Sequence, residues 1–389
     1  MTRFFELLRI AVGRQKCLSK TMSDAEWEAL LAEAEKQSLI GVCFSAIEAL
    51  PKEQLPPRIL LLNWIGQAEY EKSQYSIQCE ALQKVVHLLE EEGMEYRLMK
   101  GLGLADLYRS NSNPRLSPQQ RTLGDFDIWV RGDKEHIIRF AEKYGKLGDI
   151  VYHHVDAGKI EGVEVELHFH PSSLKNLRAN NRMQQWFDRR FSDSDVLMVG
   201  GKEIHVTSLA FNRIYVLNHI YRHLLYDGVG LRQFLDYYFV LMASHEFFSK
   251  MPNGQELWER EKEECRRLIR DFAMEHFSNA ITWALLYVFE PNALGATVVP
   301  DWVIGTPNEK RGRTLIKEML KGGNFGMYDR DKKYYLTDPW IKRYCNRIRY
   351  DMKFLWQYPE EVLWRPVWFV WEHWQNIHIF NQPLPNKSI

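Results

Sequence analysis

Two aspartates stand one residue apart in the segment RTLGDFDIWV, residues 121–130, at the start of an apolar run. Alternate side chains of a β-strand share a face, so a strand here places Asp125, Asp127 and Trp129 on one side. Two neighbouring carboxylates repel each other, and burying them without a cation is costly. The spacing therefore predicts a divalent metal site, in which two ions about 3.5–4 Å apart would support phosphoryl or nucleotidyl transfer.

A third carboxylate is expected from the segment VEVELHFH, residues 163–170. Strand alternation gives it a polar face and an apolar face. The polar face carries Glu164, Glu166, His168 and His170, and the apolar face carries Val163, Val165, Leu167 and Phe169. Oxygen ligands suit Mg²⁺, which keeps water and phosphate oxygens in its shell. We therefore expect Asp125, Asp127 and Glu166 to be catalytic metal ligands, with Mg²⁺ or Mn²⁺ as the cofactor.

The segment LMKG, residues 98–101, supplies a candidate phosphate site. It ends a strand-like run and precedes a short helical stretch, LGLADLYR. Backbone N–H groups at such a turn, together with the Lys100 ammonium, can hold an anion. Lys100 and Gly101 are therefore predicted to contact phosphate.

The elements around these residues change character along the chain. Residues 1–92 show helical periodicity, with a capping box at Ser23 and Glu26 and a stop at Gly93. The next region alternates strands and helices: we expect strands near 94–101, 125–130, 149–156 and 163–170 and a helix over 133–145, with the last two strands joined by a turn over 157–162. From Thr207 or Ser208 onward the pattern is helical again.

These ordered motifs resemble the uncharacterised nucleotidyltransferase family, a branch of the DNA polymerase β-like nucleotidyltransferase superfamily. The family's leucine-lysine-glycine, tyrosine, arginine, aspartate-x-aspartate and acid-leucine-histidine positions fall here on Lys100-Gly101, Tyr108, Arg121, Asp125/Asp127 and Glu166-Leu167-His168. The resemblance spans roughly residues 80–330. It implies an α+β fold, with a nucleotidyltransferase-like mixed sheet between two helical modules. The predicted division is 1–92 helical, 93–205 α/β core and 206–389 helical.

The resemblance also implies an activity, namely Mg²⁺-dependent transfer of a nucleoside monophosphate from an NTP to an unknown hydroxyl or phosphate acceptor. It assigns nucleotide contacts to Lys100, Gly101, Arg121 and Arg232, the last of which lies in a helical segment similar to the family's. Gly101-Leu102-Gly103 differs from the Gly-Gly or Gly-Ser of the superfamily, and the loop before Asp125 is long. A catalytically inactive binding or interaction protein on the same fold therefore remains an alternative.

Histidines offer a second enzymatic alternative. His219 and His223 share a helix face, and His168 and His170 share a strand face, so a zinc or di-metal hydrolase site is conceivable. No H-E-x-x-H motif supports it. Arg232 and Asp236 also lie four residues apart on a predicted helix, where an intrahelical ion pair is the simplest expectation.

Composition narrows the class of protein. Lys plus Arg and Asp plus Glu both number 51, so net charge does not indicate nucleic acid as a partner, although it remains possible. Five scattered Cys residues predict reduced thiols, and neither a secretory leader nor a membrane span is evident, so we expect a cytoplasmic protein. The sequence does not assign a role to two segments. They are residues 310–353, which contain 13 basic and five acidic residues, and the Trp-rich segment 362–380.

Overall fold

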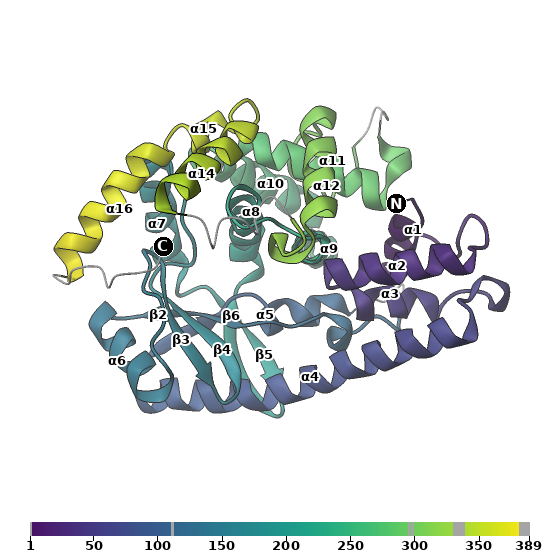
Figure 1. Ribbon diagram of the computed structural model, residues 1–389, viewed down its shortest axis with the longest axis horizontal. Helices are drawn as coiled ribbons and strands as arrows, with labels where there is room; N and C mark the ends of the chain where they lie inside the picture. Colours follow the sequence, from purple (N-terminus) through teal and green to yellow (C-terminus); the bar gives the residue numbers. More distant parts are fainter. Residues whose placement is uncertain (1, 110–112, 295, 297–298, 330–338, 381–389) are drawn as a thin grey trace.

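One six-stranded mixed sheet carries the predicted motifs in the computed structural model, which describes residues 2–109, 113–294, 296, 299–329 and 339–380 (Figure 1). The strands are β1 (Glu95–Leu98), β2 (Phe126–Arg131), β3 (His154–Ile160), β4 (Val163–His168), β5 (Ser194–Val199) and β6 (Lys202–Thr207). Their order across the sheet is β3-β4-β2-β1-β6-β5. The α+β class and the mixed sheet between helical regions are confirmed.

The centre of the sheet sets the position of the carboxylates. Strands β2 and β4 run parallel to each other, and their register pairs Asp127 with Glu166 and Trp129 with His168. Strand β1 is antiparallel to β2, and the backbone N–H of Met99 donates to the Asp127 carbonyl oxygen at 3.0 Å. This register places the end of β1 and the start of β2 beside the second half of β4.

The two faces of the sheet belong to different hydrophobic cores. The apolar face, with Ile128 and Leu167, packs against the second half of α4 (Arg58–Glu91) and against α6 (Lys134–Tyr144). In Figure 1, α4 runs below the sheet and α6 lies to its left. On the opposite face Trp129 stacks on Phe211 of α8 (Leu209–Leu225), with ring centroids 5.5 Å apart. The carboxylate face is therefore covered by the helices that follow the sheet in sequence.

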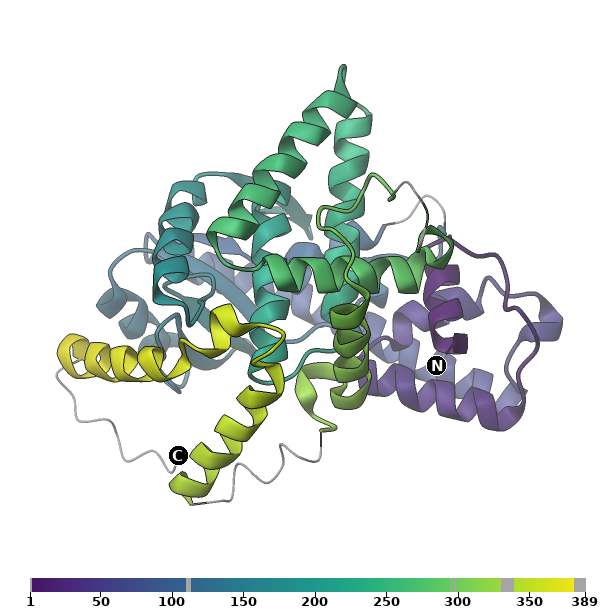
Figure 2. The ribbon, with the colours of Figure 1, turned by 90° about the horizontal axis from the view of Figure 1, so that it is seen from above.

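The helices before and after the sheet share one hydrophobic core, which also contains Trp129 from the carboxylate face of the sheet. The N-terminal helices are α1 (Thr2–Ala11), α2 (Asp24–Gln37), α3 (Ile40–Ile47) and α4; those within the α/β region are α5 (Leu102–Ala105), α6 and α7 (Leu177–Arg190). The later helices are α8, α9 (Leu231–Ser249), α10 (Gly254–Asp271), α11 (Glu275–Phe289), α12 (Glu309–Gly322), α14 (Trp340–Phe354), α15 (Pro359–Val362) and α16 (Arg365–Phe380). Figure 2 shows α1–α3 and α14–α16 at opposite ends of the molecule.

Several local predictions are confirmed. Ser23 and Glu26 form the reciprocal capping box at the start of α2, Ser208 caps α8, and Gly93 follows α4 with φ 67°. All five cysteines are free thiols. No helix among the described residues combines the length and apolar character that crossing a membrane requires. The proposed division at 92/93 and 205/206 stays a prediction, although β6 ends at Thr207.

The β3–β4 hairpin differs from the prediction. The hairpin itself is confirmed, since β3 and β4 pair antiparallel. The expected bounds of its first strand, 149–156, and of its turn, 157–162, are wrong, because β3 runs from His154 to Ile160 and the turn consists of Glu161 and Gly162. Both turn residues have positive φ, 52° and 84°, and a two-residue turn of this kind matches the strand twist. Helix α7 and the β5–β6 hairpin, which turns at Gly200 and Gly201, were not predicted.

Candidate functional site

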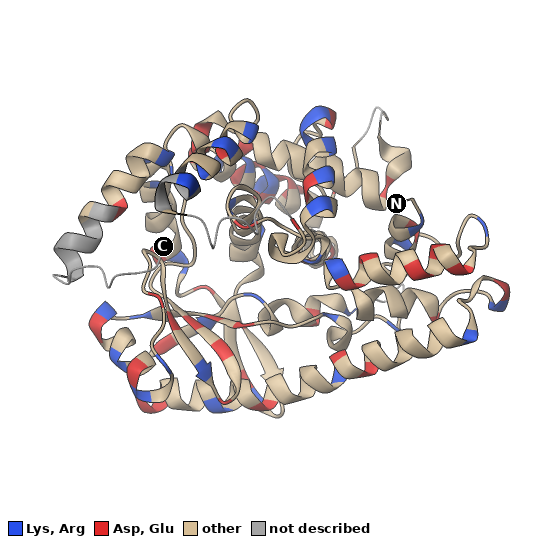
Figure 3. Ribbon diagram, viewed as in Figure 1, with Lys and Arg blue, Asp and Glu red and all other residues tan. Residues whose placement is uncertain are grey.

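The three predicted carboxylates converge at the end of the central strands. Asp127 lies on β2, Asp125 directly precedes this strand, and Glu166 lies on β4 beside Asp127. One oxygen of each carboxylate lies within 4.8 Å of the others. Figure 3 shows that several strands of the sheet carry acidic residues. The D-x-D spacing and the parallel register of β2 and β4 therefore assemble one cluster.

Two cationic side chains already contact this cluster. The Lys100 ammonium lies 2.7 Å from Asp127 Oδ1. His168 Nε2 lies 3.0 Å from the same oxygen and 3.3 Å from Glu166 Oε2. Asp127 and His168 are each only 1% exposed, so both interactions occur away from water, where electrostatic attraction is strong. The protein thus neutralises Asp127 and Glu166 with its own residues.

Asp125 is not neutralised in the same way. The negative charge of Asp127, together with burial, raises the pKa of Asp125 to about 6. Burial would also raise the pKa of Asp127, but Lys100 and His168 outweigh it and hold this pKa below its usual value. Burial is likewise outweighed at Glu166, where the hydrogen bond with His168 lowers the pKa to about 2. Asp125 therefore carries an electrostatic penalty that a bound cation would relieve.

The donor set fits a hard divalent cation. Asp125, Asp127 and Glu166 offer carboxylate oxygens, which are the ligands that Mg²⁺ and Mn²⁺ prefer. A second group, formed by His154, Glu166 and His168, has the mixed nitrogen and oxygen ligands that zinc accepts. Glu166 belongs to both groups. The repulsion at Asp125 favours the carboxylate group as the metal site.

The phosphate-side residues line a small cavity next to the carboxylates. The cavity measures about 20 Å³ and is bordered by β2, the β1–α5 turn, α8, α9 and the segment around residue 325. Its lining residues are Lys100, Gly101, Leu104, Arg121, Gly124, Asp125, Asp127, Val216, His219, Arg232, Gln233, Asp236 and Phe325. The D-x-D strand therefore lies on one side of the cavity, and α8 and α9 lie on the other. Gly101 has φ 61°, a backbone conformation that favours glycine.

Arg121 and Arg232 are placed differently within this wall. Arg121 donates from Nε and Nη2 to the two oxygens of Asp236, both at 2.8 Å, and Tyr108 donates to Asp236 at the same distance. The expected Arg232–Asp236 ion pair is therefore wrong, because Asp236 is occupied by Arg121. Arg232 instead donates to the Thr122 carbonyl oxygen at 3.0 Å, and its buried Nε has no hydrogen-bond partner among the described residues.

The 322–326 segment contributes Phe325 to the lining of the cavity. Phe325 belongs to a short 3₁₀ turn, Asn324–Gly326, and has φ 49°, which is strained for a residue with a side chain. Its ring lies 5.5 Å from the Arg232 guanidinium and 5.0 Å from the His223 ring. Asn324 accepts a hydrogen bond from Gln233 of α9 at 3.0 Å. This segment therefore forms one wall of the site.

The four histidines singled out in the sequence are not brought together. His219 and His223 lie on α8 with rings 4.3 Å apart, whereas His170 stacks on Tyr152 at 4.9 Å. Only His168 joins the carboxylates. His154, which the sequence reasoning missed, pairs with His168 in the β3–β4 register and has Nδ1 3.6 Å from Glu166 Oε2. Placing the hairpin turn correctly at Gly162 would have revealed it.

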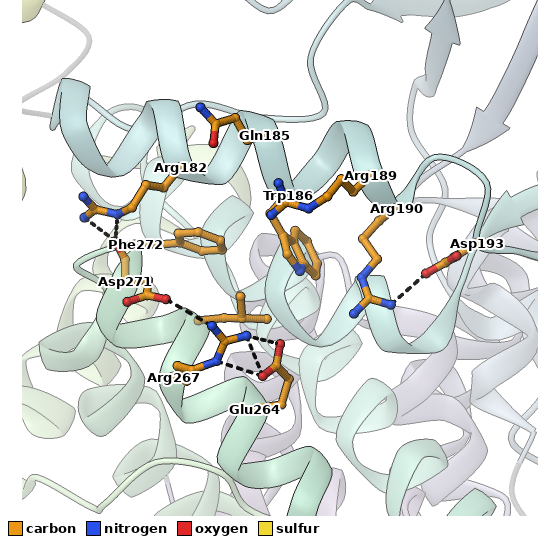
Figure 4. Close-up of a pocket in the computed structure, with 11 residues that line it drawn as sticks. Arg182, Gln185, Trp186, Arg189, Arg190, Asp193, Glu264, Arg267, Asp271 and Phe272 are labelled. Atoms are coloured by element: carbon orange, nitrogen blue, oxygen red, sulfur yellow. Dashed lines mark hydrogen bonds and ion pairs between the residues drawn. The ribbon is translucent and has the colours of Figure 1, made fainter.

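A larger cavity of about 540 Å³ lies between α7 and α10 (Figure 4). Most of its charged side chains have partners within the cavity wall. The interactions are Arg190 with Asp193 at 2.8 Å, Arg267 with Glu264 at 2.6 Å, and Arg182 with the Asp271 carbonyl oxygen at 2.8 Å. Because these charges are compensated locally, the carboxylate cluster is the stronger candidate for chemistry.

The structure describes only part of the two segments to which the sequence assigned no role, residues 310–353 and 362–380. In the basic region, Arg330, Lys332 and Lys333 lie outside the described residues, and Lys321 and Lys353 pair with Asp329 and Glu318. The blue positions on α12 and α14 in Figure 3 mark its described part. In the Trp-rich segment, Trp368 is 2% exposed and Trp374 is 54% exposed. The side chains of residues 375–380 lie outside the described residues.

Comparison of the sequence with known protein families identifies the family of this chain. The profile of a family described as uncharacterised nucleotidyltransferase matches residues 23–266, which is well over half of the chain. A crystal structure of an antigenic nucleotidyltransferase-like protein from Paracoccidioides brasiliensis aligns with a TM-score of 0.29 and 14% identity, over 62% of this chain and 96% of that one. No argument rests on so low a TM-score. No curated protein matches.

Proposed function

The chain belongs to the uncharacterised nucleotidyltransferase family, and from this premise we propose that it transfers a nucleoside monophosphate from an NTP to a hydroxyl or phosphate acceptor. The observation that supports this proposal is the convergence of Asp125, Asp127 and Glu166 within 4.8 Å, next to Lys100. A bound Mg²⁺ or Mn²⁺ at these carboxylates would offset the phosphate charge. The same residues were proposed from the sequence as the metal ligands.

The residues around the cluster take separate roles in this proposal. Lys100, Gly101 and Arg232 contact the triphosphate, and the free Nε of Arg232 supplies a donor for it. Arg121 acts as a positioning residue, since its bidentate pair with Asp236 fixes the segment leading to Asp125. Glu166 faces the acceptor and takes the proton of an acceptor hydroxyl. The acceptor oxygen bonds to the α-phosphorus, the bond to the bridging oxygen breaks, and pyrophosphate leaves with the electron pair.

Nucleotide-dependent thermal stabilisation tests the proposal directly. ATP, CTP, GTP and UTP are added with and without Mg²⁺ or Mn²⁺. A ligand that binds only the folded state adds about 2.7 kcal/mol at a hundredfold excess over Kd. We expect stabilisation by at least one NTP with metal, its loss in Asp127→Asn, and its retention in the exposed control Asp24→Asn. Stabilisation by Zn²⁺ alone would favour the metal hydrolase, and no response to any ligand would favour the inactive binding protein.

Transfer itself is followed with an NTP labelled at the α-phosphate, incubated with an extract of small molecules. Asp125→Ala or Asp127→Ala should lower the rate of label transfer by a factor on the order of a thousand or more, because each removes charge stabilisation from the transition state. In the absence of ligand, the melting temperature of Asp125→Ala should stay close to that of Asp24→Asn. Asp127→Ala should melt at a lower temperature, because it leaves Lys100 and the buried His168 without their shared carboxylate. Full metal-dependent transfer by the double variant would contradict the assignment.

A further inference from the structure

A second set of metal-ligating side chains shares Glu166 with the carboxylate cluster. Strands β3 and β4 pair antiparallel, and their register places His154 directly opposite His168. Residues opposite each other in such a pair point to the same face of the sheet, and Glu166 points there as well because it is two residues from His168. One ligand atom each of His154, Glu166 and His168 lies within 4.8 Å of the others. The hairpin register therefore builds a group of two imidazoles and one carboxylate.

The distances within this group match those between the ligands of one metal ion. Glu166 Oε2 lies 3.6 Å from His154 Nδ1 and 3.3 Å from His168 Nε2. Zinc binds nitrogen at about 2.0–2.1 Å and carboxylate oxygen at about 2.0–2.2 Å, so tetrahedral angles separate two ligand atoms by about 3.3–3.5 Å. A separation of 3.6 Å is too long for a hydrogen bond. The buried His154 Nδ1 indeed has no hydrogen-bond partner among the described residues, and an ion between these atoms would satisfy it.

The ring of His168 is oriented as the rings of metal-ligating histidines are. Its Nδ1 lies 3.3 Å from the His170 carbonyl oxygen. Because a carbonyl oxygen can only accept, Nδ1 carries a hydrogen, and Nε2 is the nitrogen that can ligate a metal. Without a metal, Nε2 needs a proton to bond with Asp127 and Glu166. A metal ion takes the place of this proton, which leaves to solvent.

The group also has an open side through which an ion can enter. The side chain of Glu166 is 29% exposed and that of His154 is 15% exposed, whereas that of His168 is 2% exposed. Water can therefore complete the coordination of a bound ion at Glu166 and His154. Catalytic zinc sites have three protein ligands and one water, whereas structural zinc sites have four protein ligands. Two histidines and one glutamate correspond to the first kind.

We propose that His154, Glu166 and His168 bind a transition-metal dication of the zinc type, in addition to the Mg²⁺ or Mn²⁺ of the carboxylate group. Imidazole nitrogen suits Zn²⁺ and its neighbours in the first transition row, whereas Mg²⁺ prefers oxygen ligands. Glu166 belongs to both groups, and its two oxygens can bridge a pair of ions about 3.5–4 Å apart. The inference goes beyond the proposed function, because metal binding by the histidine group does not require nucleotide transfer.

Zn²⁺ is the probe, titrated calorimetrically into the chelator-treated full chain in an excess of Mg²⁺. We expect tight binding of one Zn²⁺ per chain, because Mg²⁺ competes poorly for imidazole. His154→Gln should bind Zn²⁺ at least about a hundredfold more weakly, since losing a ligand costs more than the roughly 10–100-fold for losing an outer hydrogen bond. The exposed control His87→Gln should bind Zn²⁺ as the wild type does. Asp125→Asn, which removes a ligand of the carboxylate group only, should keep one-to-one binding.

Co²⁺ reports the ligand geometry in the wild type, so this measurement does not depend on the folding of a variant. Four- or five-coordinate cobalt absorbs visible light far more strongly than cobalt with six oxygen ligands, and coordination geometry is diagnostic of the ligand set. In an excess of Mg²⁺ we expect strong visible absorption that saturates at one Co²⁺ per chain. Added Zn²⁺ should abolish this absorption by displacing the cobalt.

Three results would overturn the inference. They are the absence of Zn²⁺ binding in an excess of Mg²⁺, equal Zn²⁺ affinities of His154→Gln and His87→Gln, and a cobalt spectrum typical of six oxygen ligands. These results are distinguishable from a failure of the proposed function. A chain that binds Zn²⁺ through His154 but binds no NTP would contradict the proposed function and leave the metal site standing. A chain that is stabilised by an NTP with Mg²⁺ but binds no Zn²⁺ would do the reverse.

Discussion

At the scale of single residues, two chemically identical side chains have different pKa values because their neighbours differ. Asp125 and Asp127 are separated by one residue, yet the pKa of Asp125 is raised to about 6 and that of Asp127 is lowered. Lys100 and His168 both contact Asp127, and the charge of Asp127 then acts on Asp125. Asp127 is therefore the stronger acid of the two, and the charge of Asp125 depends on the groups around it. This asymmetry is what a cation would change most.

Arg121 gives the first stability prediction. The guanidinium is 5% exposed and its partner Asp236 is 4% exposed, so removing one leaves a buried, unpaired charge. Arg121→Met should lower the free energy of unfolding by about 3–5 kcal/mol, measured by urea denaturation. The double variant Arg121→Met/Asp236→Leu should recover part of that loss, because no charge is then left unpaired.

An exposed arginine provides the control for this prediction. Arg139→Met removes an ion pair at the surface, with a side chain 62% exposed, and should change the free energy of unfolding by no more than about 0.5 kcal/mol. If Arg121→Met instead left stability at the level of Arg139→Met and only weakened NTP binding, the guanidinium would face the nucleotide and not Asp236.

At the scale of elements, the site depends on short turns as well as strands. Gly326 has φ 67°, and a Cβ atom built on it would lie 2.0 Å from the Asp227 carbonyl oxygen. The close contact of Gly326 with Asp227, which follows α8, holds Phe325 beside His223 and Arg232. The close approach of two backbones therefore fixes one wall of the cavity, and only glycine permits it.

Two glycines in the same segment make a matched test. Gly326→Ala should lower the free energy of unfolding by roughly 2–4 kcal/mol, since the new methyl group collides with backbone and the positive φ is strained. Gly322→Ala, at the end of α12, meets nothing within 4 Å and should be neutral or stabilising by up to about 1 kcal/mol. Equal urea midpoints for the two variants would contradict this account of the turn.

At the scale of the whole molecule, α4 connects the two cores. Its first half contributes Trp64 and Ala68 to the core shared by the helical regions, and its second half contributes Leu82 and Val85 to the core beneath the sheet. On the opposite face of the sheet, Trp129 belongs to the core shared by the helical regions. The sheet is therefore packed on both faces by helices from distant parts of the chain.

This arrangement predicts the result of a truncation. Residues 93–389 lack α4, so the apolar face of the sheet loses the cover given by Leu82, Val85, Val86 and Leu89, each fully buried in the intact chain. We expect this fragment to bind a hydrophobic dye strongly and to lose the near-ultraviolet circular dichroism of the intact protein. A fragment with the intact protein's spectrum would instead show that residues 93–389 fold without residues 1–92.

The sequence by itself determined the local parts of this protein. Alternation along residues 125–130 and 163–170 assigned each side chain to a face, because successive strand residues must point to opposite sides. Capping at Ser23 and Ser208 followed from side-chain chemistry within four residues. Glu166 was expected near Asp127 because it lies on the polar face of a second predicted strand, and the structure adds that the two strands pair in parallel.

Only the tertiary structure decided which distant residues meet. Arg121 pairs with Asp236, 115 positions away, although Arg232 is closer in sequence and better spaced for a helical pair. His154 joins the cluster through a hairpin whose register depends on a two-residue turn, and a shift of one residue would reverse its face. Such contacts follow from packing and register across the molecule, which local periodicity does not encode.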